Sequence, residues 1–170
     1  MGRPVVLVFI GSRSDLEAMA EARRTLDWFG VPVRVVVASA HREPDRVRAL
    51  ARKARGEGVK VVIAAAGMAA HLAGAIAAQT TLPVIGVPLE TEPFGALDSL
   101  LSTVNMPAGV PVAVVSPGRA GAVNAALLAV EMLSLTDKSL GSRLDQYRKG
   151  LASGKAARGR VVSRESADVT

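Results

Sequence analysis

Val59-Lys60-Val61-Val62-Ile63-Ala64-Ala65 is the stretch that decides the fold. It is apolar apart from Lys60, and β-branched residues form its centre. A run of this kind predicts a central parallel strand, because a strand buried on both faces has no polar face to alternate with. Gly58 precedes the run and Gly67 follows it, so breaks in regular structure mark both sides.

Similar apolar runs occur on both sides of this stretch, and they alternate with segments of helical periodicity. The predicted strands are residues 5–10, 33–37, 59–65, 84–87 and 112–115. The predicted helices cover about residues 16–29, 45–55, 71–80, 95–103, 122–135 and 137–149. Alternation with short connections predicts an α/β fold: a flavodoxin-like, doubly wound, five-stranded parallel sheet of order 2-1-3-4-5 with an additional C-terminal helix.

The length of 170 residues suits one domain. We expect a single α/β domain over residues 1–150 and a basic, flexible tail over residues 151–170. The tail contributes to a net charge of +6, which raises nucleic-acid binding as an alternative. We expect no nucleic-acid partner, because the chain lacks aromatic stacking platforms and a recognisable basic helix.

The chain has no cysteine and two histidines. This composition excludes disulfides, thiolate catalysis and zinc–thiolate sites, and it predicts no metal site. The apolar segment near the N-terminus is interrupted at residues 11–15 and is too short to span a membrane. We therefore expect a cytoplasmic protein without a membrane partner.

Two of the predicted helices, residues 71–80 and 122–135, have little polar surface. A helix that is apolar all round must be buried. In so small a domain we expect part of that burial to come from neighbouring subunits, which predicts a homo-oligomer. The alternative is deep burial within the monomer.

Ligands of open α/β sheets bind beyond the carboxyl ends of the strands, near the point where the strand order reverses. In the predicted order, the turns after the first three strands meet there. These turns are residues 11–15, 39–44 and 67–71, and both histidines of the chain, His41 and His71, fall in them. We therefore expect the functional site at these turns.

The first turn, residues 11–15, opens a helix, where free backbone N–H groups and the helix dipole favour an anion. Ser12 can donate a hydrogen bond, and Asp15 can accept one from sugar hydroxyls. The alternative is helix capping by Ser14 and Asp15, which would leave Ser12 without a role. The turn matches neither the phosphate-loop lysine motif nor G-x-G-x-x-G, so we expect neither a nucleoside triphosphate nor a dinucleotide.

The second turn places a hydroxyl, an imidazole and a guanidinium in Ser39-Ala40-His41-Arg42. Arg42 suits a phosphate or a carboxylate, and His41 is of the residue type that carries protons near neutral pH. An exposed turn with Ser39 or Glu43 as a cap is the structural alternative.

The third turn, residues 67–71, has mostly small side chains, which let the backbone approach a ligand closely. Its amides can hold a carboxylate or shelter a small neutral molecule. His71 either orients a substrate or caps its helix. For Ala64 to Ala66, just before this turn, tight packing between helix and sheet is an equally good interpretation.

Seven short motifs occur in a fixed order between about residues 5 and 149. They are Gly11-Ser12-x-Ser14-Asp15, Ser39-Ala40-His41-Arg42, Ala69-Ala70-His71-Leu72, Gly86-Val87-Pro88, Asp98-Ser99-Leu100, Met106-Pro107-x-Gly109-Val110-Pro111-Val112 and Asn124-Ala125-Ala126-Leu127-Leu128. With this ordered set the chain resembles the class I N5-carboxyaminoimidazole ribonucleotide mutase family, the PurE family of purine (IMP) biosynthesis.

The resemblance implies a flavodoxin-like domain assembled as an octamer, with its sites at subunit contacts. It implies an isomerase that moves a carboxylate from the exocyclic nitrogen to a ring carbon of aminoimidazole ribonucleotide. The family route is decarboxylation to enclosed carbon dioxide, followed by recarboxylation at carbon. No metal, ATP or organic cofactor takes part.

The resemblance also assigns roles to residues. His41 is the expected catalytic proton shuttle, and Ser12, Asp15 and Arg42 match ligand-binding positions. The other expected substrate-binding residues line the site: Ser39, Gly67, Met68, Ala69, His71 and Leu72.

Three positions depart from the family pattern. Met68 stands where the family usually has Gly, Ala73 where it has Pro and Asn105 where it has Gln. Met68 matters most, because its side chain can narrow or reshape the carbon dioxide pocket. A paralogue acting as a direct aminoimidazole ribonucleotide carboxylase and a non-catalytic phosphate- or nucleotide-binding module stay open as alternatives. The retained Ala69-Ala70-His71-Leu72 segment favours the mutase class.

Overall fold

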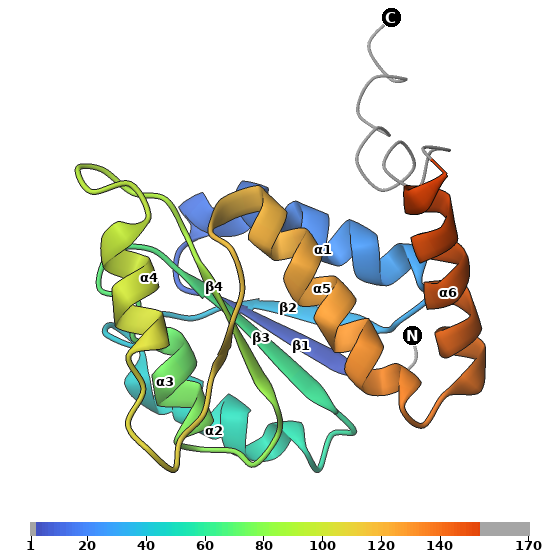
Figure 1. The fold of residues 1–170 in the computed structure, drawn as a ribbon. Helices are drawn as coiled ribbons and strands as arrows, with labels where there is room; N and C mark the ends of the chain where they lie inside the picture. The colour runs from blue at the N-terminus through green and yellow to red at the C-terminus, as the bar shows by residue number, and fades with distance from the viewer. Residues whose placement is uncertain (1–2, 154–170) are drawn as a thin grey trace, which may run out of the picture.

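Five parallel strands form one sheet in the order β2-β1-β3-β4-β5 (Figure 1). The structure is a computed structural model, and it describes residues 3–153. The strands are β1 (Val6–Ile10), β2 (Val33–Val37), β3 (Val61–Ala66), β4 (Val84–Pro88) and β5 (Ala113–Val114). This order confirms the flavodoxin-like sheet predicted from the sequence.

Helices cover both faces of the sheet (Figure 1). They are the short 3₁₀ helix η1 (Arg13–Asp15), then α1 (Leu16–Trp28), α2 (Pro44–Ala54), α3 (Leu72–Ala77), α4 (Leu97–Val104), α5 (Gly118–Ser134) and α6 (Lys138–Ala152). The layer of α1 and α5 packs on one face, and α2 and α3 pack on the other. Helix α6 packs on α5 and is the additional C-terminal helix that the sequence predicts.

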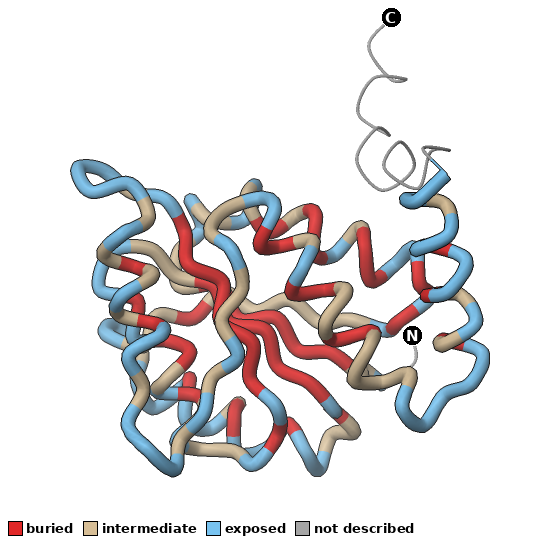
Figure 2. Tube along the Cα trace, in the orientation of Figure 1, coloured by how far each residue is buried: buried red, intermediate tan, exposed pale blue. Residues whose placement is uncertain are grey.

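Strands β1, β3 and β4 are the most deeply buried elements of the described chain, whereas β2 is only partly buried (Figure 2). All residues of β1 are buried, and their side chains alternate between the two layers. Val8 and Ile10 join the cluster with α1 and α5, whereas Leu7 and Phe9 join the cluster with α2 and α3. The chain thus fills two cores with aliphatic residues and needs few aromatic ones.

The boundaries of several elements differ from those predicted, most clearly in α5, α3 and β5. Helix α5 begins at Gly118 instead of residue 122, so Gly121 belongs to its first turn and not to a preceding loop. A Cβ on Gly121 would come within 1.6 Å of the Ser116 backbone oxygen, so glycine serves close packing there. Helix α3 is shorter than predicted, and β5 has only two residues.

One face of helix α5 is fully buried within its own chain. Its residues Ala122, Ala125, Ala126, Ala129 and Val130 have no exposed surface, because they pack against α1 and the sheet. For these residues burial within the monomer, the alternative interpretation of the apolar 122–135 segment, is the correct one. A group of exposed large apolar side chains lies on and before α4 instead: Phe94, Leu97, Leu101 and Val104.

Two contacts fasten α1 to the C-terminal helices. The buried Glu21 carboxylate pairs with Arg119 at the start of α5. At the other end of α1, the Trp28 ring meets Tyr147 of α6 edge-on, with ring centroids 5.7 Å apart, and Phe29 completes the cluster.

Helix α6 continues to Ala152, so the predicted tail begins inside a helix. The remainder of the tail, from residue 154, lies outside the described residues. Within residues 3–153, no helix has both the length and the apolar character that crossing a membrane requires.

Gly86 fixes the distance between β4 and α4. A Cβ at this position would come 2.5 Å from Cγ2 of Thr103 and 3.1 Å from Cγ1 of Val112. We expect Gly86→Ala to lower the free energy of unfolding by about 1–3 kcal/mol, because it overpacks this contact. Urea denaturation followed by circular dichroism measures the change.

Thr103→Ser removes the obstructing methyl group and keeps the hydroxyl that donates to the Ser99 carbonyl at 2.7 Å. The double variant should therefore recover most of the stability that Gly86→Ala loses. Gly56→Ala is the control, since a Cβ there meets nothing closer than 3.5 Å. An equal loss in the control would contradict the packing explanation.

Candidate functional site

A cavity of about 560 Å³ lies at the carboxyl ends of β1, β2 and β3. The turns after these strands form its walls, together with one residue from the loop after β4. The lining residues are Gly11, Ser12, Ser14, Asp15, Ser39, Ala40, His41, Arg42, Ala66, Gly67, Met68, Ala69, His71, Leu72 and Thr91. Every residue that the sequence predicts for the site is among them, so the fold brings the whole set together.

The two histidines meet inside this cavity. His41 Nε2 lies 2.8 Å from His71 Nδ1, and the two rings stand edge to face at 82°. One imidazole must donate the hydrogen bond and the other must accept it, so one of these two nitrogens carries no proton. The pair can therefore hold a proton and pass it along the bond.

In the first turn, the Ser14 hydroxyl oxygen lies 3.0 Å from both Ser12 Oγ and Asp15 Oδ1. Neither Ser14 nor Asp15 caps α1 with its side chain, so the capping interpretation of this turn is wrong. The three side chains instead form a small polar group on the wall of the cavity. The group offers hydroxyl donors and a carboxylate acceptor side by side.

In the second turn, Ser39 accepts two backbone hydrogen bonds and so acts as the cap that the structural alternative for this turn predicts. Its hydroxyl accepts the Arg42 N–H at 3.3 Å, and its carbonyl accepts the Glu43 N–H at 2.8 Å. Arg46 donates a hydrogen bond to the Glu43 carboxylate, and this bond lowers the pKa of Glu43. Within residues 3–153 the Arg42 guanidinium has no such acceptor, so all its donors can turn to a ligand.

In the third turn, Met68 has φ of 55°, in the left-handed region that favours glycine. An L-residue pays about 1–2 kcal/mol for this conformation. The Met68 N–H donates to Thr91 Oγ1 at 3.1 Å, and a Cβ on Gly67 would come 2.5 Å from Thr91 Cγ2. Residues 67 and 68 are thus pressed against Thr91, which holds the strained turn in place.

Thr91 is the site residue that reasoning from the sequence missed. It lies in the loop after β4, in a segment interpreted only as a connection. The available signal was positional: the loop follows the fourth parallel strand, so it begins at the same edge of the sheet as the other three turns. Among the described residues, no group of three or more His, Asp or Glu side chains is placed to hold a metal ion.

Residues 5–153 match the family model described as AIR carboxylase. The N5-carboxyaminoimidazole ribonucleotide mutase of Brucella melitensis is 51% identical over 153 residues, which cover 90% of this chain and 94% of the relative. The enzyme of the same name from Bacillus subtilis is 52% identical over 147 residues, 86% of this chain and 91% of the relative.

A solved structure has the same fold. The crystal structure of Treponema denticola PurE superposes with a TM-score of 0.81 at 26% sequence identity, covering 95% of this chain and all of the other. Because the family model and close relatives both span nearly the whole described region, the chain belongs to the AIR carboxylase family.

Proposed function

We propose that this chain is a mutase that converts N5-carboxyaminoimidazole ribonucleotide into 4-carboxy-5-aminoimidazole ribonucleotide in purine biosynthesis. The observation that carries this proposal is the bonded pair of His41 and His71 in a cavity that Arg42 also lines. The volume of about 560 Å³ lies in the usual range for small-molecule sites. The similar relatives that bear the mutase name support the same reaction.

Arg42 binds the phosphate of the nucleotide in this proposal. Its forked donors suit a phosphate, and the start of α1 adds a favourable dipole on the facing wall. Asp15 accepts hydrogen bonds from the ribose hydroxyls, and Ser12 supplies a further polar contact. The imidazole ring of the substrate then points toward the histidine pair.

The reaction breaks one bond and forms another, and one proton moves each way. The bond between the exocyclic nitrogen and its carboxylate breaks, carbon dioxide leaves, and the nitrogen takes a proton. The ring carbon then attacks carbon dioxide, and its proton leaves to His41, which is the general acid and base. Gly67 and Ala69 leave room for the carbon dioxide beside the ring.

His71 positions His41 through their hydrogen bond. The bond fixes which nitrogen of His41 carries a proton, as partner groups do for catalytic histidines. The bond also allows His71 to hold the proton while carbon dioxide is free in the cavity. His71 is exposed to solvent, so the pair can exchange its proton with water.

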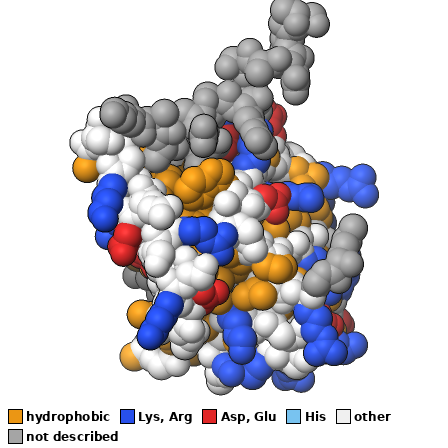
Figure 3. Space-filling view, turned by 90° about the vertical axis from the view of Figure 1, so that its right-hand side faces the viewer, with side chains coloured by type: hydrophobic (Ala, Val, Ile, Leu, Met, Phe, Trp, Pro, Cys, Tyr) orange, Lys and Arg blue, Asp and Glu red, His pale blue; other side chains and the backbone are white. Residues whose placement is uncertain are grey.

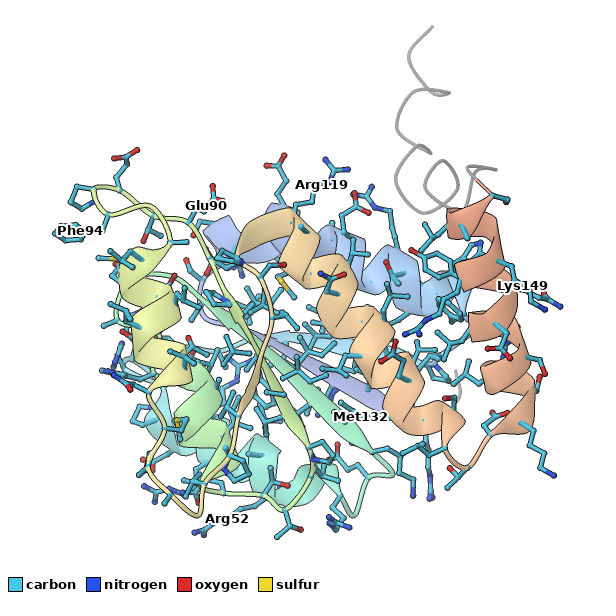
Figure 4. The ribbon with its side chains drawn as sticks, viewed as in Figure 1. Arg52, Glu90, Phe94, Arg119, Met132 and Lys149 are labelled. Atoms are coloured by element: carbon cyan, nitrogen blue, oxygen red, sulfur yellow. The ribbon has the colours of Figure 1, made fainter. Side chains whose placement is uncertain are left out.

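We infer that the chain forms a homo-oligomer through the face built by α3, α4 and β5. Residues 99–118 contain no charged side chain, and charge depletion is typical of interface centres. Leu97, Leu101 and Val104 of α4 are all more than half exposed. Phe94 projects from the loop before α4 (Figure 4).

The side of the molecule that carries α6 differs from this face in having many charged side chains (Figure 3). Figure 3 shows Lys and Arg side chains spread among hydrophobic ones on that face. An octamer, as the family resemblance implies, would bury the uncharged face and leave charged surface toward water. The absence of cysteine fits a reducing cytoplasm as the place of action.

His41→Asn should abolish turnover while nucleotide binding persists. Asparagine keeps a polar side chain but cannot carry the proton, so we expect kcat to fall by about 10²–10⁴-fold. Calorimetric titration with aminoimidazole ribonucleotide measures binding. An assay with the carbamate nucleotide, compared with aminoimidazole ribonucleotide plus bicarbonate, measures turnover and separates a mutase from a direct carboxylase.

His71→Asn is the matched control for the histidine pair. It leaves His41 in place and removes its partner, so its effect on kcat should be smaller than that of His41→Asn. Normal turnover by His41→Asn would refute the proposed role of His41.

Arg42→Ala should weaken nucleotide binding by roughly tenfold to a hundredfold, because a charge-assisted hydrogen bond to phosphate is lost. The dephosphorylated nucleoside should bind the variant and the native protein alike. Arg48→Ala is the control, since Arg48 lies on α2, which follows the turn with Arg42, and does not line the cavity. Equal losses for nucleotide and nucleoside would contradict a phosphate contact.

Leu101→Glu should split the oligomer, because it places a charge at the centre of the uncharged face. Size-exclusion chromatography with light scattering measures the mass. Leu135→Glu is the control, because Leu135 is 85% exposed at the end of α5 and lies away from α4. A native mass for Leu101→Glu would rule out this face as the interface.

A further inference from the structure

Met68 is the one described residue other than glycine that has a positive φ. Glycine would adopt this backbone conformation without strain, and nothing in the turn itself requires a side chain. The hydrogen bond to Thr91 uses the Met68 backbone N–H, which glycine would also supply. Backbone strain of this kind persists only where the surrounding structure imposes it, and strained residues are common at ligand-binding sites.

Packing in the empty protein does not account for the side chain. Met68 is 63% exposed, so its thioether gains little from burial. The side chain nevertheless lies on the wall of the cavity, between Gly67 and Ala69. It is the longest apolar side chain of that wall that solvent reaches, since Leu72 is buried.

We propose that Met68 folds over the bound nucleotide and keeps carbon dioxide in the cavity during carboxylate transfer. Its three rotatable bonds and polarizable sulfur let it adapt to a ligand surface. Between cleavage of the nitrogen–carbon bond and formation of the carbon–carbon bond, carbon dioxide is neutral and held by no charge. An apolar cover retains it better than a glycine, which has no side chain to close the wall.

This inference rests on the proposed mutase function, and two measurements separate the two. The first measures whether a bound nucleotide shields the Met68 side chain, and it needs no turnover. Dilute hydrogen peroxide oxidises exposed methionine, and mass spectrometry of peptides follows the sulfoxide at Met68. Aminoimidazole ribonucleotide should slow oxidation of Met68 at least fivefold and leave Met106, which lies outside this cavity, unaffected. Unchanged oxidation of Met68 in the saturated protein would overturn the proposal.

The second measurement follows the carbon dioxide itself. Substrate labelled with ¹⁴C in its carboxylate is converted in a large pool of unlabelled bicarbonate, and the label retained in the product is counted. Met68→Gly should lose at least threefold more label than the native protein, and Met68→Leu should restore retention. Met68→Ala keeps the backbone strain but lacks the cover, so it should behave like Met68→Gly.

Equal label retention in the native protein and Met68→Gly would overturn the role of Met68, and the mutase function would stand. Failure of the native protein to convert the substrate would instead refute the proposed function, and the oxidation experiment would still decide whether Met68 covers a nucleotide. Met68→Gly relieves the strained backbone, so we expect it to fold, and thermal unfolding checks this.

Discussion

The hydrogen bond between His41 and His71 depends on three parallel strands that end together. Strands β2 and β3 do not pair with each other, because β1 lies between them and pairs with both. The register aligns Ile10 with Val37 on one side and with Ala65 on the other. A slip of one residue would exchange the buried faces of a strand and separate the histidines. The apolar strands thus set the geometry of a polar site to which they contribute no polar side chain.

The sequence was sufficient for the sheet and for the meeting of the three turns at one edge of it. The stretch from Val61 to Ala65 is apolar at every position, as a strand covered by helices on both faces requires. The other apolar runs of the chain alternate with helical segments. Given the strand order, the rule that ligands bind beyond the carboxyl ends brings the three polar turns together. Family motifs then selected residues within those turns, and all the selected residues line one cavity. Local pattern and topology agree here, which is why the strand order and the meeting of these turns could be predicted.

What the sequence did not reveal depends on side chains that meet across the fold. The contact between Met68 and Thr91 joins two loops that lie 23 residues apart, and no periodicity encodes it. The hydrogen bond between His41 and His71 likewise depends on their side-chain rotamers and not on their spacing in the sequence. Apolar periodicity marked residues 122–135 as buried, but it did not tell whether the covering surface belongs to the same chain. The structure buries that helix against α1 and leaves α4 exposed, because α4 covers only the short edge of the sheet beside β5.

The aromatic contact between α1 and α6 has a spectroscopic consequence. Trp28 is the one tryptophan of the chain and Tyr147 its one tyrosine, so intrinsic fluorescence arises at a single place. Helix α1 begins at the cavity and carries Trp28 as the last of its 13 residues, on the order of 20 Å away along the axis. Because Trp28 packs against Tyr147 and lies far from the cavity, we expect its emission to respond to the docking of α6 more than to a ligand in the cavity. Trp28 is therefore an intrinsic fluorescence probe for the packing of α6 on α1.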